Sequence, residues 1–501
     1  MFKNFHGFNL LEQYSEWKKQ NRAKKNPLSK RFLKVSFVAI LTLLLWFIPS
    51  SVYGLPGLNP IEQRVIAIFA FAALMWLFDA VPAWTTSLMV VVLLLFSTSD
   101  SGLWFLQSGA DGVKYENLVS YKAILACFAD PTIMLFIGGF IIAIAATKSG
   151  LDVKLAKVLL KPFGTKSENV LLGFLLVTGL FSMFISNTAT AAMMLTFLTP
   201  VLRALPADGK GKIGLALAIP IGANIGGMGT PIGTPPNAIA LKYLSEQGMA
   251  VGFGEWMMVM APLTIILLLI AWFVLRFLFP FKQKTIVLEI DDKHIKSDWR
   301  NYVVYVTFAV TIVLWLTDTI TGVNANVVAM LPVGVLAIAG VITKRDLEEI
   351  SWSILWMIAG AFALGVAMKQ TGLATHLIES IPFADWSPLL VIIGSGLICY
   401  LMANFISHTA TAALFVPILA VVGQNMEALG DFGGVSTLLI GVAVGSSVAM
   451  LLPISTPPNA LADATGMIKQ KDMVKTGIIM GLAGLLLGYT VLIFAGKYGI
   501  F

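Results

Sequence analysis

Charged residues are few in this sequence. They make up 12% of the 501 positions, whereas hydrophobic residues make up 57% and the mean hydropathy is +0.84. So few charges cannot cover the surface of a water-soluble protein of this length. Apolar runs recur along the whole chain, which excludes a soluble domain with a single membrane anchor. We therefore expect the lipid bilayer to be the main solvent of this protein.

Cysteine is scarce too. The two cysteines, Cys127 and Cys399, lie within apolar stretches and show no metal-ligand spacing, which favours a buried structural role. The net charge of +7 does not indicate a nucleic-acid partner. That function requires Lys and Arg on one face of a folded domain, whereas here they fall between the apolar runs.

Groups that would support enzyme catalysis are missing from the apolar segments. No acidic pair, metal-ligand cluster or Ser-Lys arrangement lies at membrane depth. Ser407 and His408 are adjacent, but neighbouring residues of a helix do not face each other. We expect no enzyme activity and no cofactor, apart from a possible sodium ion discussed below.

The long apolar segments predict an all-α polytopic membrane protein with about 11 transmembrane helices, since about 20 residues are needed for each crossing. Segments 169–202 and 386–426 contain no Lys, Arg, Asp or Glu. As one helix the first would be about 51 Å long, whereas the hydrocarbon core is about 30 Å thick. Each segment is therefore expected to form a re-entrant hairpin with a polar tip.

The basic residues between the spans predict the orientation. With a cytoplasmic N-terminus, 27 of the 34 Lys and Arg residues fall on the cytoplasmic side, as the positive-inside rule requires. Residues 1–31 are polar and basic and lack the apolar core of a cleavable signal. We interpret them as a cytoplasmic interfacial helix of a multi-pass plasma-membrane protein.

The two halves of the chain repeat each other at an offset of 221 or 222 residues. The string ISNTATAA at 185–192 returns as ISHTATAA at 406–413, and GTPPNA at 233–238 returns as STPPNA at 455–460. Our assignment places five crossings between the starts of the two copies, so the second copy is expected to be inverted in the membrane. Two inverted repeats are typical of transporters that work by alternating access.

A pair of prolines interrupts one apolar crossing in each repeat, at 235–236 and at 457–458. Proline has no N–H and blocks helix propagation, so we expect broken helices at 211–246 and 436–467. Unpaired backbone groups are costly in hydrocarbon and are tolerated only where protein, water or a ligand satisfies them. The two breaks therefore predict a cavity within the membrane.

Helix starts at the breaks and hairpin tips are expected to give this cavity a positive potential. Thr234 and Thr456 are placed to cap the second half-helices, and Ser186 and Ser407 the returning hairpin arms. Each helix start carries about half a positive charge, so four converging starts supply about two. That potential suits a divalent anion without a buried arginine. The alternative is that the polar tips only hold helices together.

On these residues the sequence resembles the divalent anion/sodium symporter family of dicarboxylate transporters, within the ion-transporter superfamily, over about residues 30–500. The most specific marks are the paired signatures at 186–188 and 407–409 and the two proline pairs. The resemblance implies a homodimer that works as an elevator. In this arrangement a scaffold domain stays still, while a transport domain made of both hairpins and both broken helices crosses the membrane.

We therefore expect the chain to have five parts. They are the interfacial helix at 1–31, scaffold helices at 32–130, repeat 1 at 131–280, a linker with scaffold helices at 281–352, and repeat 2 at 353–501.

The resemblance also implies where the ligands bind. Substrate carboxylates are expected at the signature tips and at the Thr-Pro steps, which involves Ser186, Asn187, Thr188, Thr234, Ser407, His408, Thr409, Thr456 and Pro457. A possible sodium site is formed by Ser182, Ser186, Asn187 and Gly233. Oxygen ligands of this kind suit a hard cation.

Repeat 2 departs from the family pattern. His408 stands where asparagine is expected, and Ala403 matches Ser182. A neutral imidazole is a poor sodium ligand, whereas a protonated one could replace the missing cation, or the ring could simply fill space. We therefore expect a sodium-independent exchanger of C4 and C5 dicarboxylates such as succinate, malate, fumarate and 2-oxoglutarate. The alternatives are a sodium-coupled dicarboxylate or citrate symporter and an anion channel.

Overall fold

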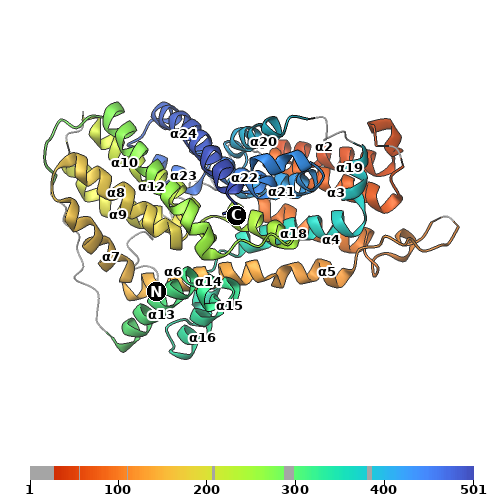
Figure 1. Cartoon of the computed structure of the whole chain (residues 1–501), viewed down its shortest axis with the longest axis horizontal. Coiled ribbons are helices and arrows are strands. Elements are labelled where there is room, and N and C mark those ends of the chain that lie inside the picture. Colours follow the sequence, from red (N-terminus) through yellow and green to blue (C-terminus); the bar gives the residue numbers. More distant parts are fainter. Residues whose placement is uncertain are drawn as a thin grey trace.

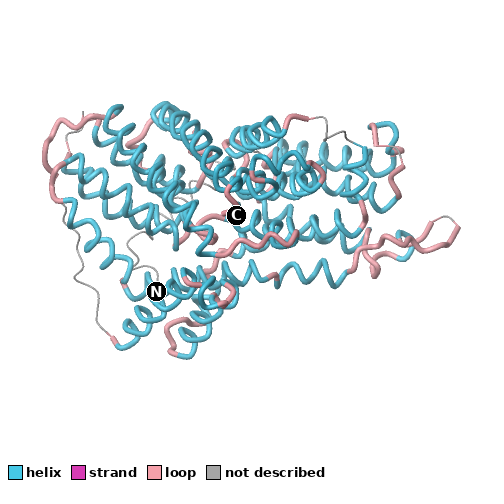
Figure 2. The backbone as a smooth tube through the Cα atoms, viewed as in Figure 1, coloured by secondary structure: helices cyan, strands magenta, loops and turns pink. Residues whose placement is uncertain are grey.

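The computed structural model describes residues 28–55, 57–109, 111–205, 209–286, 298–380 and 386–500. Within these ranges the chain is helical, with three isolated β-bridges and no β-strand (Figure 2). The all-helical prediction is confirmed. Most of the interfacial helix expected at 1–31 falls outside the described residues, which begin at Leu28 with the first residue of α2.

Eight helical segments of the described chain are long and apolar enough to cross a membrane. They are α3 (Pro60–Leu77), α5 with α6 (Tyr121–Ser149), α8 (Ser167–Phe184), α10 with a short 3-10 turn (Gly211–Gly229), α12 (Phe253–Leu278), α13 (Trp299–Leu316), α18 (Trp352–Gln370) and α24 (Gln470–Lys497). The predicted number of about 11 crossings stays a prediction.

The remaining helices are shorter than 18 residues, apart from α2, which carries more charge than a span of this kind allows, and α9. They are α2 (Leu28–Phe47), α4 (Ala83–Ser97), α7 (Leu151–Leu160), α9 (Asn187–Ala204), α11 (Pro235–Glu246), α14 (Asp318–Thr321), α15 (Ala325–Val328), α16 (Met330–Ile338), α17 (Lys344–Glu348), α19 (Leu373–Ser380), α20 (Pro388–Ala403), α21 (His408–Gln424), α22 (Gly434–Ser447) and α23 (Pro457–Ala464).

The two segments expected to form hairpins each consist of two helices joined by a polar tip. In repeat 1 these are α8 and α9, and in repeat 2 they are α20 and α21. A serine begins the returning helix in both. Ser186 Oγ accepts a hydrogen bond from Ala189 N at 3.3 Å, and Ser407 Oγ accepts one from Ala410 N at 3.1 Å. The sequence therefore stops one helix and starts the next at each tip through an N-cap.

The two proline pairs begin new helices, because proline is well suited to the first turn and unsuited to later ones. α10 ends at Gly226 and α11 begins at Pro235, while α22 ends at Ser447 and α23 begins at Pro457. Thr234 and Thr456 occupy the predicted N-cap positions. Only Thr456 caps through its side chain, since its Oγ1 accepts a hydrogen bond from Asn459 N at 3.2 Å.

The two repeats pack in corresponding pairs and then exchange their second half-helices. α8 packs on α10, and α20 packs on α22. Beyond the breaks, α11 packs against α21 and α22, whereas α23 packs against α9 and α10. Figure 1 shows α8 to α10 toward one end of the long axis and α20 to α22 toward the other, with α23 and α24 between them. Both breaks therefore lie where the repeats meet.

An ion pair fixes the end of α6 (Pro131–Ser149) to the first turn of α17 (Lys344–Glu348). Lys148 Nζ lies 2.6 Å from Asp346 Oδ2, which also accepts hydrogen bonds from Thr343 N and Oγ1 at 2.7 Å. Burial alone raises the pKa of Asp346, but the hydrogen bonds from Lys148 and Thr343 outweigh it and lower the pKa below its usual value. The stabilisation is therefore present at neutral pH and is lost as the pH falls through that lowered pKa.

We predict that Asp346→Ala lowers the midpoint of thermal unfolding by roughly 3–8 °C, because Lys148 loses its buried partner and Thr343 its cap. Size-exclusion chromatography of detergent-solubilised protein after heating measures this midpoint. Glu348→Ala, at an exposed position of the same helix, serves as the control. Equal midpoints for the two variants would contradict the structural role of this pair.

Candidate functional site

The tip of the first hairpin gathers oxygen atoms around Ser182. Its hydroxyl is fully buried and lies 2.7 Å from Asn187 Oδ1 and 2.8 Å from Ala223 O. A hydroxyl has one hydrogen, so it can satisfy only one of these two acceptors at a time. Three oxygens thus share a single hydroxyl proton, and the hydroxyl that carries it is fully buried. Such an excess of acceptors favours a hard cation.

The break of repeat 1 closes around the same tip. A Cβ added to Gly227 would lie 2.7 Å from Asn187 Oδ1 and 3.1 Å from Gly233 O, so the glycine permits this close approach. Asn237 Nδ2 donates to Gly227 O at 3.0 Å and to Thr230 O at 2.8 Å, which satisfies the carbonyls released by the break. The structure therefore brings Asn187 and Gly233 together beside Ser182.

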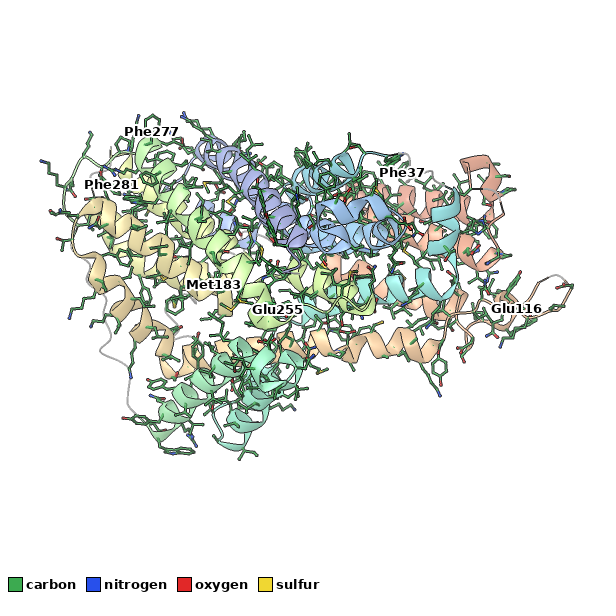
Figure 3. The ribbon with its side chains drawn as sticks, viewed as in Figure 1. Phe37, Glu116, Met183, Glu255, Phe277 and Phe281 are labelled. Carbon is green, nitrogen blue, oxygen red and sulfur yellow. The ribbon has the colours of Figure 1, made fainter. Side chains whose placement is uncertain are left out.

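A hydroxyl at the break ties it to the hairpin. Thr230 Oγ1 donates to Met183 O and accepts a hydrogen bond from Gly233 N at 3.1 Å. Met183 lies near the end of α8, within the body of the molecule (Figure 3). The break and the tip of repeat 1 therefore hold each other in place.

The two repeats are joined by one buried asparagine. Asn224 Nδ2 donates to Thr456 Oγ1 at 3.2 Å and to Asn459 Oδ1 at 3.0 Å. An amide group carries two hydrogens, and here both point to repeat 2. Asn224 directly follows Ala223, whose carbonyl contacts Ser182, so the break of repeat 2 lies next to the oxygen cluster of repeat 1.

Repeat 2 builds its tip differently. His408 Nε2 lies 2.6 Å from Ala449 O, so Nε2 carries the proton, because a carbonyl only accepts. Ala403 is buried where repeat 1 has Ser182. Asn459 Nδ2 donates to Met450 O at 2.9 Å and to Leu452 O at 3.0 Å, as its counterpart Asn237 does in repeat 1. The break is thus supported in both copies, while the excess of acceptor oxygens is found at the first tip.

The break of repeat 2 is also tied to its hairpin. Ser455 Oγ donates to Asn404 O at 3.0 Å, and Leu451 N donates to Asn404 Oδ1 at 2.8 Å. Asn404 precedes the tip serine by three residues. Its side chain therefore fixes the loop of the break, and both oxygens of Asn404 accept hydrogen bonds from that loop.

The other predicted site residues belong to the same tips and breaks. Ser186 lines a small cavity between the hairpin tip and α6, together with Phe140 and Ile232. Asn187, Thr188 and Ser407 are half-buried, Thr234 and Thr409 are buried, and Pro457 is exposed. Within the described residues, the side chains of Thr188, Thr234 and Thr409 form no hydrogen bond with another site residue. Their role in binding stays a prediction.

Sequence reasoning missed the four asparagines that hold the breaks. Asn237 and Asn459 belong to the duplicated PPNA strings, so their repetition was a usable signal. Asn224 has Ser446 as its counterpart and Asn404 lies outside the signature, so neither is marked by the repeat. In the part of the chain that the structure describes, no group of three or more His, Cys, Asp and Glu residues could hold a metal.

Known proteins of similar sequence indicate the family to which this chain belongs. A family model described as a citrate transporter, CitMHS, matches residues 73–432. An uncharacterized transporter of Haemophilus influenzae is 31% identical over 474 residues, which cover 91% of this chain and 95% of the relative. The sodium-dependent dicarboxylate transporter SdcS of Staphylococcus saprophyticus is 28% identical, covering 86% of this chain and 85% of the relative.

Solved structures show the same fold at low sequence identity. The YdaH transporter of Alcanivorax borkumensis matches with a TM-score of 0.55 and 13% identity, covering 87% of this chain and 98% of that one. MtrF of Neisseria gonorrhoeae matches with a TM-score of 0.51 and 15% identity, covering 82% of this chain and 94% of that one.

The fold and the paired breaks define a multi-pass membrane transporter of the ion-transporter superfamily rather than an enzyme. Within that superfamily, the chain belongs to the divalent anion/sodium symporter family of dicarboxylate transporters. The resemblance seen in the sequence is confirmed.

We predict that Gly227→Ala lowers dicarboxylate uptake by cells about tenfold, because the added methyl group displaces Asn187 from the oxygen cluster. Gly394→Ala is the matched control, since a Cβ at this helical position of α20 meets nothing within 4 Å. Uptake of a radiolabelled dicarboxylate, normalised to protein in the membrane, measures the effect. Equal uptake by both variants would show that the close approach is not needed.

Proposed function

We propose that this protein is a secondary active transporter that couples the movement of C4 or C5 dicarboxylates, such as succinate, malate, fumarate or 2-oxoglutarate, to that of sodium. The observation that carries the proposal is the cluster in which Ser182, Asn187 and Ala223 share three oxygens and one proton. The names of the relatives support it, because several are sodium-dependent dicarboxylate transporters.

Coupling to sodium fits the oxygen cluster and the relatives better than exchange does. The sequence favoured sodium-independent exchange, on the ground that repeat 2 lacks two oxygen ligands. The relatives support the sodium-coupled alternative instead, and so does the contact of Ser182 with Asn187 and Ala223 in repeat 1. We therefore replace the exchanger with a symporter that uses one sodium site, formed by Ser182, Asn187, Ala223 and the backbone near Gly233.

Coupling follows from the position of the cluster. Asn187 lies next to Ser186, whose hydroxyl caps the helix that starts at the tip. A cation bound at Asn187 would hold the tip in one conformation and add positive charge beside the substrate carboxylate. Each ligand would then raise the affinity for the other by the same factor, as linkage requires.

The dicarboxylate itself would be bound by uncharged groups. Helix starts at Ser186 and Ser407 and at the two breaks present N–H groups and hydroxyls, and each favours negative charge. Two such starts on opposite repeats are suited to two carboxylates. We assign substrate contacts to Ser186, Asn187, Thr188, Thr234, Ser407, His408, Thr409, Thr456 and Pro457.

We also propose which parts of the protein move during transport. The transport domain would consist of α8 to α11 and α20 to α23, and the scaffold of the remaining spans, paired in a homodimer. The chain would reside in the plasma membrane with a cytoplasmic N-terminus, as the distribution of Lys and Arg indicates.

A second candidate, sodium-independent exchange, is favoured by the ring of His408. The ring contacts Ala449 O in repeat 2. This carbonyl is the counterpart of Gly227 O, which lies near the oxygen cluster of repeat 1. The ring can therefore fill, in repeat 2, the place that a cation would take in repeat 1. In an exchanger, substrate would cross only when another dicarboxylate returns. The two candidates therefore differ in a simple uptake experiment.

Purified protein in liposomes is expected to take up labelled succinate only when external sodium is present, without any internal dicarboxylate. Ser182→Ala should raise the sodium concentration for half-maximal uptake about tenfold, because it removes one ligand of the cation. Uptake that needs internal succinate but not sodium would establish exchange instead. An anion channel would be indicated by succinate-driven current that needs neither.

Ser186→Ala and Ser407→Ala should each lower succinate uptake by about tenfold or more, since each removes a hydroxyl that is expected to bind a carboxylate. Thr199→Ala, in α9 but away from the tip, is the control because its hydroxyl bonds only within its own helix. Membrane insertion is checked by immunoblot. Uptake equal to that of the unmodified protein in both serine variants would refute the assigned site.

A further inference from the structure

A largely buried ion pair connects the broken helix of repeat 1 to the helix that begins at Pro131. Lys242 Nζ of α11 lies 2.5 Å from Asp130 Oδ2, and the two side chains are only 11% and 13% exposed. Asp130 is the N-cap of α6 and accepts a hydrogen bond from Thr132 N at 2.9 Å. Lys242 also pairs with Glu246 at 2.9 Å, but that contact stays within α11.

The same end of α11 contacts a second helix. The ammonium of Lys242 lies 4.4 Å from the ring centroid of Phe362 in α18, close enough for a cation–π interaction. The hydroxyl of Tyr243 packs against Gly365, where a Cβ would overlap it. This hydroxyl is buried without a hydrogen-bond partner in the described residues. The contact is therefore tight, yet no hydrogen bond is broken when Tyr243 moves away from Gly365.

Repeat 2 lacks the charged residues and the tyrosine of this arrangement. Ala464 stands at the position that matches Lys242, Thr465 at that of Tyr243, and Trp352 at that of Asp130. Yet repeat 2 forms the same hairpin and break. The ion pair is therefore not needed to build a repeat, and it acts on one side of the molecule only.

The surroundings of the pair leave room for movement. A cavity of about 610 Å³ extends from Asp130 and Lys242 to Pro231 in the break, between α6, α11, the start of α12 and α14 to α15. The other acids on its wall already have partners. Asp318 accepts hydrogen bonds from Phe253 N and Gly254 N, and Glu255 caps Gly252 N. Asp130 is thus the acid that pairs with Lys242 across two helices.

We propose that Lys242 and Asp130, with Phe362 as the second contact, form a latch that holds α11 against α6 and α18 at one end of the transport cycle. The latch must open for substrate to cross. Because Ile232 lies in the same break and packs beside Gly139 of α6, opening the latch also uncovers Ile232. The latch rests on the proposed function in so far as α11 moves during transport.

The first test follows the exposure of an introduced thiol. Ile232→Cys is made in a Cys127→Ser, Cys399→Ser background, and the full-length protein in liposomes is labelled with N-ethylmaleimide. Lys242→Met keeps the apolar stem over Phe362, and Asp130→Asn keeps an oxygen to cap α6. Each should speed labelling about tenfold, as expected when one partner of a largely buried ion pair is removed. The double variant should label no faster than the quicker single one.

Glu246→Gln is the matched control, since it removes the other partner of Lys242 without releasing α11. It should change labelling less than about twofold. Unchanged labelling in both Lys242→Met and Asp130→Asn, or an equal increase in Glu246→Gln, would overturn the latch.

The second test closes the latch chemically. Asp130→Cys and Lys242→Cys together, in the same background, should allow a short bis-methanethiosulfonate to bridge α6 and α11. Bridging should stop succinate uptake, and a reductant should restore it, whereas each single variant stays active after the same treatment. A bridged protein that transports at the unbridged rate would refute the proposal. Unmodified protein that transports no dicarboxylate would refute the proposed function alone, because the labelling test does not depend on the substrate.

Discussion

Interrupting two helices inside a membrane exposes backbone groups that lipid cannot satisfy, and this constraint shapes the centre of the molecule. The chain meets it with side-chain amides. Asn237 and Asn459 donate to the loop carbonyls of their own breaks, and Asn224 joins one repeat to the other. Because these amides satisfy the carbonyls, both breaks can persist inside the membrane. The proposed binding of a divalent anion without fixed positive charge depends on this arrangement.

The two repeats are alike in backbone and different in chemistry. Both carry a serine-capped tip and a proline-started half-helix, which explains why the breaks meet. Ser182 and Asn187 create an excess of oxygens in repeat 1, whereas Ala403 and His408 remove it in repeat 2. The ion pair of Lys242 with Asp130, the N-cap of α6, likewise has no charged counterpart in repeat 2, where Ala464 and Trp352 stand at the matching positions. In the proposed account, these differences limit sodium to one site and bias the transport cycle toward one end.

Much of the fold could be predicted because duplication and proline carry strong local signals. The hairpins at 169–202 and 386–426 and the breaks at the proline pairs correspond to helix ends in the structure within a few residues. The family followed from the same strings. The number of crossings could not be predicted in the same way. The helices α4 and α15 with α16 are shorter than a full span, and composition alone does not show whether they cross the membrane.

The site was only partly accessible from the sequence. Proximity of Ser182, Asn187 and Gly233 could be expected from the resemblance, but the bond from Asn224 to Thr456 joins residues more than two hundred positions apart, and no local pattern encodes it. Thr234 occupies its predicted cap position, yet its hydroxyl caps nothing, because Thr230 holds the loop instead. In the sequence, Lys242 could be identified only as a basic residue near a span, because its partner Asp130 is distant along the chain.

The central claim is that uncharged groups at the paired tips and breaks bind a divalent anion. A cryo-electron microscopy structure of the protein in lipid nanodiscs with saturating succinate and sodium tests it most directly. The account predicts succinate between the Ser186 and Ser407 tips, with each carboxylate at a helix start and no Lys or Arg in contact. Succinate bound instead beside Lys242, in the cavity that reaches Asp130, would contradict it.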